Sequence, residues 1–374
     1  FNTNYDNPFD RLYPWSEMVV CNVDLVAYRQ RTGTEPLTDF ITAVYGDPDF
    51  TYYGNKDLFV GRYVPEFWYR SSEDTLGRIT YLVSLTARVG YVHSPEMITS
   101  IGFAVDAGLD ANNNAVITSG AGIPLHSIAC STIHTRAGNS GFTIESIREL
   151  DAILTLYLVE YANMNSQDAL GDGCSDQYRE NASDVVGTVT LESGGTAIEV
   201  LNTATAFVDC LEVGAEVDFG ATNGAVTYRS ILLSYEQNGG GTGYILHVSG
   251  DLSSVTTGMY ASFHGFATCE FPYIGQSIGN ASGYIGTNSK ANAFYRGAMF
   301  HANRYSYILG IYRETGTNHI WTCPDNLDPD DYDALNTSVH QDSGVALPTL
   351  ASAAWQTIGG NAQRFTGAQA FPVS

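Results

Sequence analysis

The sequence predicts an α+β protein in which a small all-β domain is inserted into a larger unit. Over 1–112, short aromatic and β-branched runs separated by turn residues indicate a β-rich N-terminal region. Over 113–182, apolar residues recur at three- and four-residue steps, as in amphipathic helices. Residues 183–268 are rich in Val, Thr and Gly with nearly alternating polarity, which is typical of strands. Residues 269–374 are irregular and rich in Gly, Asn and aromatic residues.

Several elements within these regions have recognisable boundaries. The run "DLFVGRYVPEFWYR" at 57–70 contains Pro65, which cannot donate to a ladder, and predicts an edge or bent strand. Gly138 stands where a first helix would end, and Thr143 is the expected N-cap of a second, longer helix. The second helix is expected to carry acidic residues in its first turns and to bury one stripe; these are Glu145 and Glu149, and Ile147, Leu150, Leu154, Leu158 and Tyr161.

The charge of the chain restricts its partners. It has 17 basic and 40 acidic residues and a net charge of -23, so it lacks the Lys/Arg surface that nucleic acid requires. Only 15% of residues are charged, while Tyr (24) and Gly (38) are abundant, a composition that recognition surfaces favour. No apolar run approaches the roughly 18–20 residues that cross a bilayer, so no membrane insertion is expected. The opening "FNTNYDNPFD" has no signal-peptide pattern.

The six cysteines are far apart in the sequence, and none belongs to a CxxC pair. A compact zinc site is therefore not expected, and a chain of this size does not need disulfides. We expect free, mostly buried thiols at Cys21, Cys130, Cys174, Cys210, Cys269 and Cys323.

Four motifs occur in an order that resembles a family of phage tail or virion proteins. They are "FDRLYPWSEMVVCN", "AVYGDP", "LVEYANMNSQDALGDGC" and "SIGNASGYIG...NAFYRG". The shared part resembles a C-type lectin-like domain, which also occurs in formylglycine-generating enzymes and in the variable proteins of diversity-generating retroelements. Some members carry a small β insertion where residues 183–268 lie. The chain departs from the pattern at "AMFHANRYSYILGIYRE" (298–314). The family's usual closing strand does not follow "AAWQTIGGNAQRFTGAQAFPVS", so either the chain is short or its true C-terminus lies beyond Ser374.

The resemblance implies a virion component on the surface of a phage particle (tail tip, fibre or capsid surface), with no enzymatic activity and no cofactor. Its expected role is non-covalent binding of a host-cell surface glycan or protein. By analogy with other virion proteins, a homotrimer that also contacts other virion proteins is expected. A structural decoration or baseplate protein is the alternative. A formylglycine-type oxidase is disfavoured, because that activity needs two neighbouring thiols and Cys269 and Cys323 are isolated. The resemblance also implies that Asn165 and Gln167 are buried parts of the scaffold.

The candidate receptor-binding residues lie in the C-terminal third, where aromatic, Asn and Arg residues are dense, as at interaction hot spots. They form two groups: Phe300, His301, Asn303, Arg304, Tyr305 and Tyr307, and then Asn361, Gln363, Arg364 and Phe365. The first group departs from the family pattern and is expected to be exposed. By contrast, Tyr295 and Arg296 of the family-like "YRG" are expected to be structural.

The densest acidic run, "CPDNLDPDDYD", offers hard oxygen ligands of the kind that Ca²⁺ prefers. These are Asp325, Asp328, Asp330, Asp331 and Asp333. The run lacks the Gly and the terminal Glu of an EF-hand, and it matches no calcium-dependent lectin motif, so a solvated acidic loop is the preferred interpretation. His126 and His134 are too far apart for a helical metal pair, and no triad is recognisable in the sequence. We therefore expect no metal and no catalytic residue.

Overall fold

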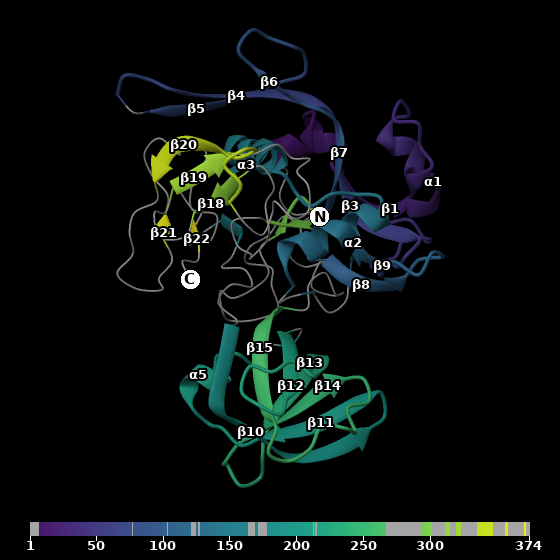
Figure 1. Ribbon diagram of the computed structural model, residues 1–374, viewed down its shortest axis with the longest axis vertical. Helices are drawn as coiled ribbons and strands as arrows, with labels where there is room; N and C mark the ends of the chain where they lie inside the picture. Colours follow the sequence, from purple (N-terminus) through teal and green to yellow (C-terminus); the bar gives the residue numbers. More distant parts are fainter. Residues whose placement is uncertain are drawn as a thin grey trace.

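The structure is a computed structural model of the chain, and most of its regular secondary structure is β-strand. It describes residues 7–76, 78–102, 104–120, 125, 128–163, 169–170, 178–211, 213, 215–266, 294–300, 311–314, 319–322, 335–346, 356–357 and 370–371. Within these residues, four α-helices accompany the strands, which gives a β-rich α+β fold (Figure 1). No helix in this part of the chain is long and apolar enough to span a membrane.

The N-terminal region forms an antiparallel four-stranded sheet with the order β2-β1-β3-β7. Its strands are β1 (Val19–Asp24), β2 (Ile41–Val44), β3 (Leu58–Val64) and β7 (Met97–Ser100). Short helices flank them. Three are 3-10 helices, η1 (Pro8–Arg11), η2 (Trp15–Glu17) and η3 (Leu37–Phe40), and one is the α-helix α1 (Leu25–Arg29). Asp24, the last residue of β1, is the N-cap of α1, because its side chain accepts hydrogen bonds from two backbone amides of the helix.

A second sheet, with the order β5-β4-β6, follows directly after β3. Its strands are β4 (Phe67–Glu73), β5 (Ile79–Ser84) and β6 (Val92–Ser94). The predicted strand over 57–70 is therefore two strands in two sheets, and the break falls at Pro65, where no amide can continue the ladder. Strand β3 lies between β1 and β7, and β4 lies between β5 and β6, so the prediction of an edge strand is wrong. Strands β8 (Ala104–Leu109) and β9 (Ala115–Ser119) form a separate ribbon.

Helices α2 (Cys130–Ser140) and α3 (Ile147–Tyr161) lie beside these sheets, α2 against β9 and α3 beneath β4 and β5 (Figure 1). Helix α3 begins at Ser146 rather than Thr143, because Ser146 has Glu149 three residues later and the two form a reciprocal capping box. Helix α2 ends at Ser140, beyond Gly138, because the C-cap residue Gly141 adopts the left-handed conformation (φ +93°) that terminates the helix.

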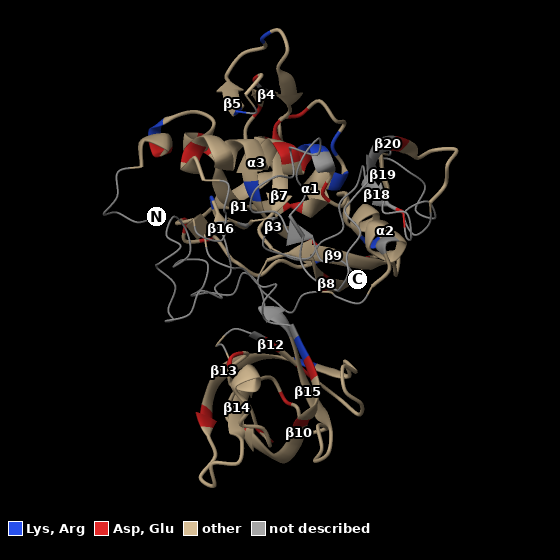
Figure 2. Ribbon diagram, turned by 90° about the vertical axis from the view of Figure 1, so that its left-hand side faces the viewer, with Lys and Arg blue, Asp and Glu red and all other residues tan. Residues whose placement is uncertain are grey.

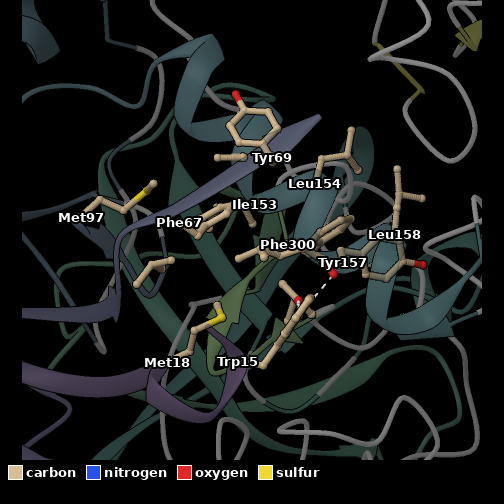
Figure 3. Close-up of a cluster of buried hydrophobic side chains, with 14 of the residues drawn as sticks. Trp15, Met18, Phe67, Tyr69, Met97, Ile153, Leu154, Tyr157, Leu158 and Phe300 are labelled. Carbon is tan, nitrogen blue, oxygen red and sulfur yellow. Dashed lines mark hydrogen bonds between the residues drawn. The ribbon is translucent and has the colours of Figure 1, made fainter. Parts of the chain in front are cut away.

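One hydrophobic core joins segments that are far apart in the sequence (Figure 3). Trp15 and Met18 come from the N-terminus, Phe67 from β4 and Tyr157 from α3. A two-residue hairpin, β16 (Phe294–Tyr295) and β17 (Ala298–Met299), adds C-terminal residues to the same core. The Trp15 indole Nε1–H donates to the Tyr295 hydroxyl at 3.0 Å. The N-terminal and helical regions thus share a core with the C-terminal segment 294–300.

The hairpin turn carries a buried ion pair. Arg296 and Gly297 both have positive φ (50° and 81°), as a tight two-residue hairpin turn requires. The Arg296 guanidinium binds both carboxylate oxygens of Glu160, at 2.5 and 3.1 Å, and one of Asp10 at 2.6 Å. The side chains of Arg296 and Glu160 are only 9% and 3% exposed. The structural role expected for Tyr295 and Arg296 is confirmed, since Tyr295 is fully buried.

Residues 178–266 form a closed six-stranded barrel with its own hydrophobic core, at the end of the molecule opposite β4–β6 (Figure 1). The sequence predicted a β domain over 183–268. The strand order is β10-β11-β14-β13-β12-β15. The elements are β10 (Tyr178–Glu192), β11 (Gly195–Val200), α5 (Thr205–Val208), β12 (Ala215–Gly220), β13 (Tyr228–Gln237), β14 (Tyr244–Ser249) and β15 (Tyr260–Phe266). Because β10 pairs with β15, the chain enters and leaves the barrel on neighbouring strands.

The described C-terminal residues form short strands. Strands β18 (Ile311–Arg313), β19 (His319–Thr322) and β20 (Gln341–Ala346) make a three-stranded sheet. Strands β21 (Gln356–Thr357) and β22 (Ala370–Phe371) pair with each other. Of the six cysteines, Cys21 and Cys210 are buried and form no disulfide within the described residues, as predicted. The side chains of the other four lie outside the described residues, as do Asn165 and Gln167.

Replacing Arg296 is expected to destabilise the fold, because it leaves the buried Glu160 carboxylate without its cation. Arg296→Met should lower the free energy of unfolding by about 3–5 kcal/mol in urea denaturation. Asp10→Asn removes the half-exposed partner and should cost about 1 kcal/mol or less. Equal losses in the two variants would show that the Arg296–Glu160 pair does not stabilise the hairpin.

The Cys21 thiol is expected to resist alkylation, because burial raises its pKa to about 12. At pH 9 an unfolded cysteine is largely thiolate, whereas native Cys21 stays protonated. Iodoacetamide followed by peptide mass mapping should label Cys21 only after denaturation. The raised pKa also means that its contribution to stability is present below about pH 8.5 and is lost as the pH rises towards 12. Native labelling at the rate of the denatured chain would contradict this assignment.

Candidate functional site

Of the predicted receptor-binding residues, the described part of the chain contains only Phe300, and the exposure expected for it is wrong. Phe300 is 2% exposed, and its ring lies 4.6 Å from the Tyr157 ring and 5.9 Å from the Tyr295 ring, centroid to centroid. The hydrophobic core therefore takes up an aromatic side chain that the sequence placed on the surface. The remaining candidates lie outside the described residues: His301, Asn303, Arg304, Tyr305, Tyr307, Asn361, Gln363, Arg364 and Phe365.

The five candidate calcium ligands, Asp325, Asp328, Asp330, Asp331 and Asp333, also lie outside the described residues. Within the described part, no group of three or more His, Cys, Asp or Glu side chains is placed to hold a metal ion. The candidate site described below is therefore built from other residues.

The β5-β4-β6 sheet has two faces of different character. Side chains alternate between the faces along a strand, and directly paired residues point to the same face. Phe67 and Tyr69 of β4 are buried in the main core, where Tyr81 and Val83 of β5 pack against them. Helix α3 contacts β4 and β5, so this is the inner face. Trp68 and Arg70 of β4 consequently point outward.

The half-buried Trp68 indole is the centre of the outer face, which we call the Trp68 face. It comprises Glu66, Trp68, Arg70, Leu82, Ser84, Arg88 and His93. Trp68 is paired with Ser84 on β5 and with His93 on β6, so the three side chains form one row across the sheet. The His93 ring stacks on the indole, with a centroid separation of 4.9 Å and an interplanar angle of 26°. The stack fixes the orientation of the indole, and Trp68 remains partly exposed.

Glu66 and Arg88 complete opposite ends of this row. The His93 Nε2 atom lies 3.1 Å from a Glu66 carboxylate oxygen, and both side chains are about half exposed (50% and 49%). At the other end, Arg88 Nε donates to the Ser84 hydroxyl at 2.9 Å, and Ser84 donates to the Thr86 carbonyl at 2.9 Å. The face thus presents a carboxylate at its β6 end and a guanidinium at its β5 end.

Arg70 and Arg88 form no ion pair with a carboxylate in the structure as described. Other arginines do: Arg78 pairs with Asp74, and Arg179 pairs with Asp184. A methyl group built on Gly90 would lie 3.5 Å from Arg70 Nη1, so this guanidinium rests beside the β5–β6 loop that also carries Arg88. In a chain with a net charge of -23, two such cations on one face provide a local attraction for anions.

Exposed apolar side chains border the Trp68 face. Leu82 on β5 is 39% exposed, and in the β5–β6 loop Leu85 and Val89 are 56% and 98% exposed. Apolar residues gathered on a surface mark sites of interaction. In Figure 2, strands β4 and β5 stand at the end of the molecule opposite the barrel, where a partner can approach them.

The arrangement is suited to binding. The indole offers an apolar surface, Arg70 and Arg88 offer hydrogen-bond donors, and Glu66 offers an acceptor. Sequence reasoning did not find this face. The alternation in "EFWYR" placed Trp68 and Arg70 on one face of a strand, but Phe67 and Tyr69 are equally apolar, so the pattern does not show which face is solvated.

Comparison with protein-family models, with curated proteins and with solved structures found no match to this chain.

The two faces of β4 predict unequal effects of substitution. Tyr69→Ala removes a buried ring and should lower the free energy of unfolding by about 3–5 kcal/mol. Trp68→Ala removes a half-buried ring stacked on His93 and should cost about 1 kcal/mol. Urea denaturation of both variants measures the difference. A loss of stability at Trp68 as large as that at Tyr69 would place the indole in the core and remove the Trp68 face.

Proposed function

We propose that this protein is a bacteriophage virion surface component, at a tail tip, fibre or capsid surface, that recognises a host-cell surface glycan or protein without covalent chemistry. The single observation that carries the recognition role is the Trp68 face. It combines a partly exposed indole with two arginines that form no ion pair with any carboxylate among the described residues. Tryptophan and arginine are the residues most enriched at binding hot spots. The virion assignment rests on the four sequence motifs.

We further propose that the main unit is a C-type lectin-like domain interrupted by the barrel. Two features support this proposal. Residues before and after the barrel share one core, in which Trp15, Tyr157 and Tyr295 meet. The barrel begins and ends on the paired strands β10 and β15, so its insertion separates the flanking residues very little.

In this proposal, a rigid scaffold presents the side chains of the Trp68 face to the host-cell receptor. The inner residues Phe67 and Tyr69 hold the sheet on α3, so the outer side chains bind without reorganisation of the backbone. A face of seven residues gives a weak individual contact. Several copies in a symmetric virion would strengthen it by avidity, and a homotrimer is the assembly that we propose.

The alternative is a decoration or baseplate protein that contacts other virion proteins. The fully exposed Val89 and the neighbouring Leu85 in the β5–β6 loop favour this role, because apolar side chains on a loop are suited to packing against protein. The two roles differ in what happens when the protein is absent from the particle.

Fluorescently labelled protein, presented as a multimer to a panel of bacterial isolates, tests the recognition role. We expect saturable binding to some isolates, and Trp68→Ala should weaken it at least tenfold, equivalent to about 1.4 kcal/mol. Tyr53→Ala is the matched control, because it removes an exposed ring (57%) outside the Trp68 face and should leave binding unchanged.

The two roles predict opposite results in a particle that lacks the protein. If particles assemble but no longer attach to cells, the recognition role is supported. If no isolate binds the protein and deletion of its gene prevents assembly, the recognition role fails and the decoration role stands.

A further inference from the structure

We infer that the Trp68 face binds a sugar ring that carries a single carboxylate, that is, an acidic saccharide. This inference rests on the proposed recognition function and names its ligand class. It is built from three properties of the face: an aromatic ring that stacks on His93, two arginines (Arg88 at the β5 end of the row and Arg70 two residues after Trp68 on β4), and the Glu66 carboxylate at the β6 end.

The aromatic ring accounts for the sugar. One side of a pyranose carries only C–H groups, which pack against an indole while the hydroxyl groups point outward to polar side chains. Trp68 is flanked in its row by His93 and by the small Ser84, and the Trp68 side chain is only partly buried. His93 fixes one side by stacking, and little side-chain entropy is lost when a ring docks on the accessible part.

The two arginines account for the acid. A guanidinium binds a carboxylate through two parallel hydrogen bonds, and such charge-assisted bonds are stronger than those to neutral groups. Among the described residues, Arg70 forms no ion pair and Arg88 donates to the neutral Ser84 hydroxyl, so neither cation has to leave a described carboxylate to bind a ligand. A neutral sugar would use neither charge.

The net charge of the chain limits the ligand to few charges. At -23 the whole protein repels a polyanion such as nucleic acid or a heavily charged polysaccharide. At physiological salt, however, charges more than about 8 Å away are largely screened, so the two nearby arginines dominate the potential felt by one carboxylate. A single acidic group on an otherwise neutral sugar fits both conditions.

Glu66 sets the orientation of the ring. Its carboxylate lies at the β6 end of the row beside His93, where it repels a ligand carboxylate and accepts hydrogen bonds from sugar hydroxyl groups. Arg88 lies at the β5 end. The ligand acid therefore points to β5 and the hydroxyl groups point to β6.

Saturation-transfer NMR with two disaccharides tests this inference: one ends in glucuronate, and the other is its match ending in glucose. The full chain should bind the glucuronate compound at least tenfold more tightly than its neutral match. Trp68→Ala should abolish both signals. Arg70→Met with Arg88→Met should reduce the affinity for the glucuronate compound to that for the neutral match.

Two controls exclude general effects. Arg148→Met removes an exposed arginine on α3, outside the Trp68 face, and should change neither affinity. Raising the salt concentration from 50 to 300 mM should weaken the binding of the glucuronate compound and leave the binding of the neutral compound unchanged. Unfolding curves for each variant show that the chain is folded.

The results for sugars and for cells separate this inference from the proposed function. Equal affinity for the two disaccharides, or no affinity for either, overturns the acidic-saccharide assignment. If neither disaccharide binds but Trp68→Ala still weakens cell binding, the recognition function stands with a different ligand. If the glucuronate compound binds while no cell does, the saccharide site stands and the host-recognition function fails.

Discussion

The burial of helix α3 on more than one side is the constraint on which the rest of the main unit depends. Leu150, Leu154 and Leu158 form the stripe that an amphipathic helix buries, but Ile153 and Tyr157 are buried as well. The β4–β5 sheet covers one part of the helix, and the hairpin from Phe294 onward covers another through Tyr157. A helix packed in this way fixes the positions of both neighbours.

This packing has a direct consequence for the Trp68 face. Because α3 covers the inner side chains Phe67 and Tyr69, the period of two along the strand forces Trp68 and Arg70 outward. Their positions are set by a rigid core, although their own side chains contribute little to it. A binding surface on strands is held more precisely than one on a loop, and the β5–β6 loop that carries Arg88 is tied to the sheet through Ser84.

The barrel buries its apolar side chains in a core of its own, separate from the core around α3. Its apolar side chains, such as Val217 and Phe219, point into a closed interior, and its strands have no open edge within the ring. Entry and exit on β10 and β15 mean that the two domains do not need to share side chains in order to fold. The buried bidentate pair of Arg179 and Asp184 near the entry point belongs to the barrel itself.

Local patterns in the sequence determined where helices and strands form. The apolar spacing from Ile147 onward specified α3, and the alternation over the barrel segment specified strands, since these periods follow from backbone geometry alone. Only the tertiary structure decided which aromatic residues face solvent. Phe67, Trp68 and Phe300 are all large aromatic residues, so residue type does not predict which of them is exposed. Contact with α3 buries Phe67 and Phe300, whereas Trp68 points away from the helix and is partly exposed. Burial depends on partners distant in sequence, such as Tyr157 for Phe300, and no local pattern contains them.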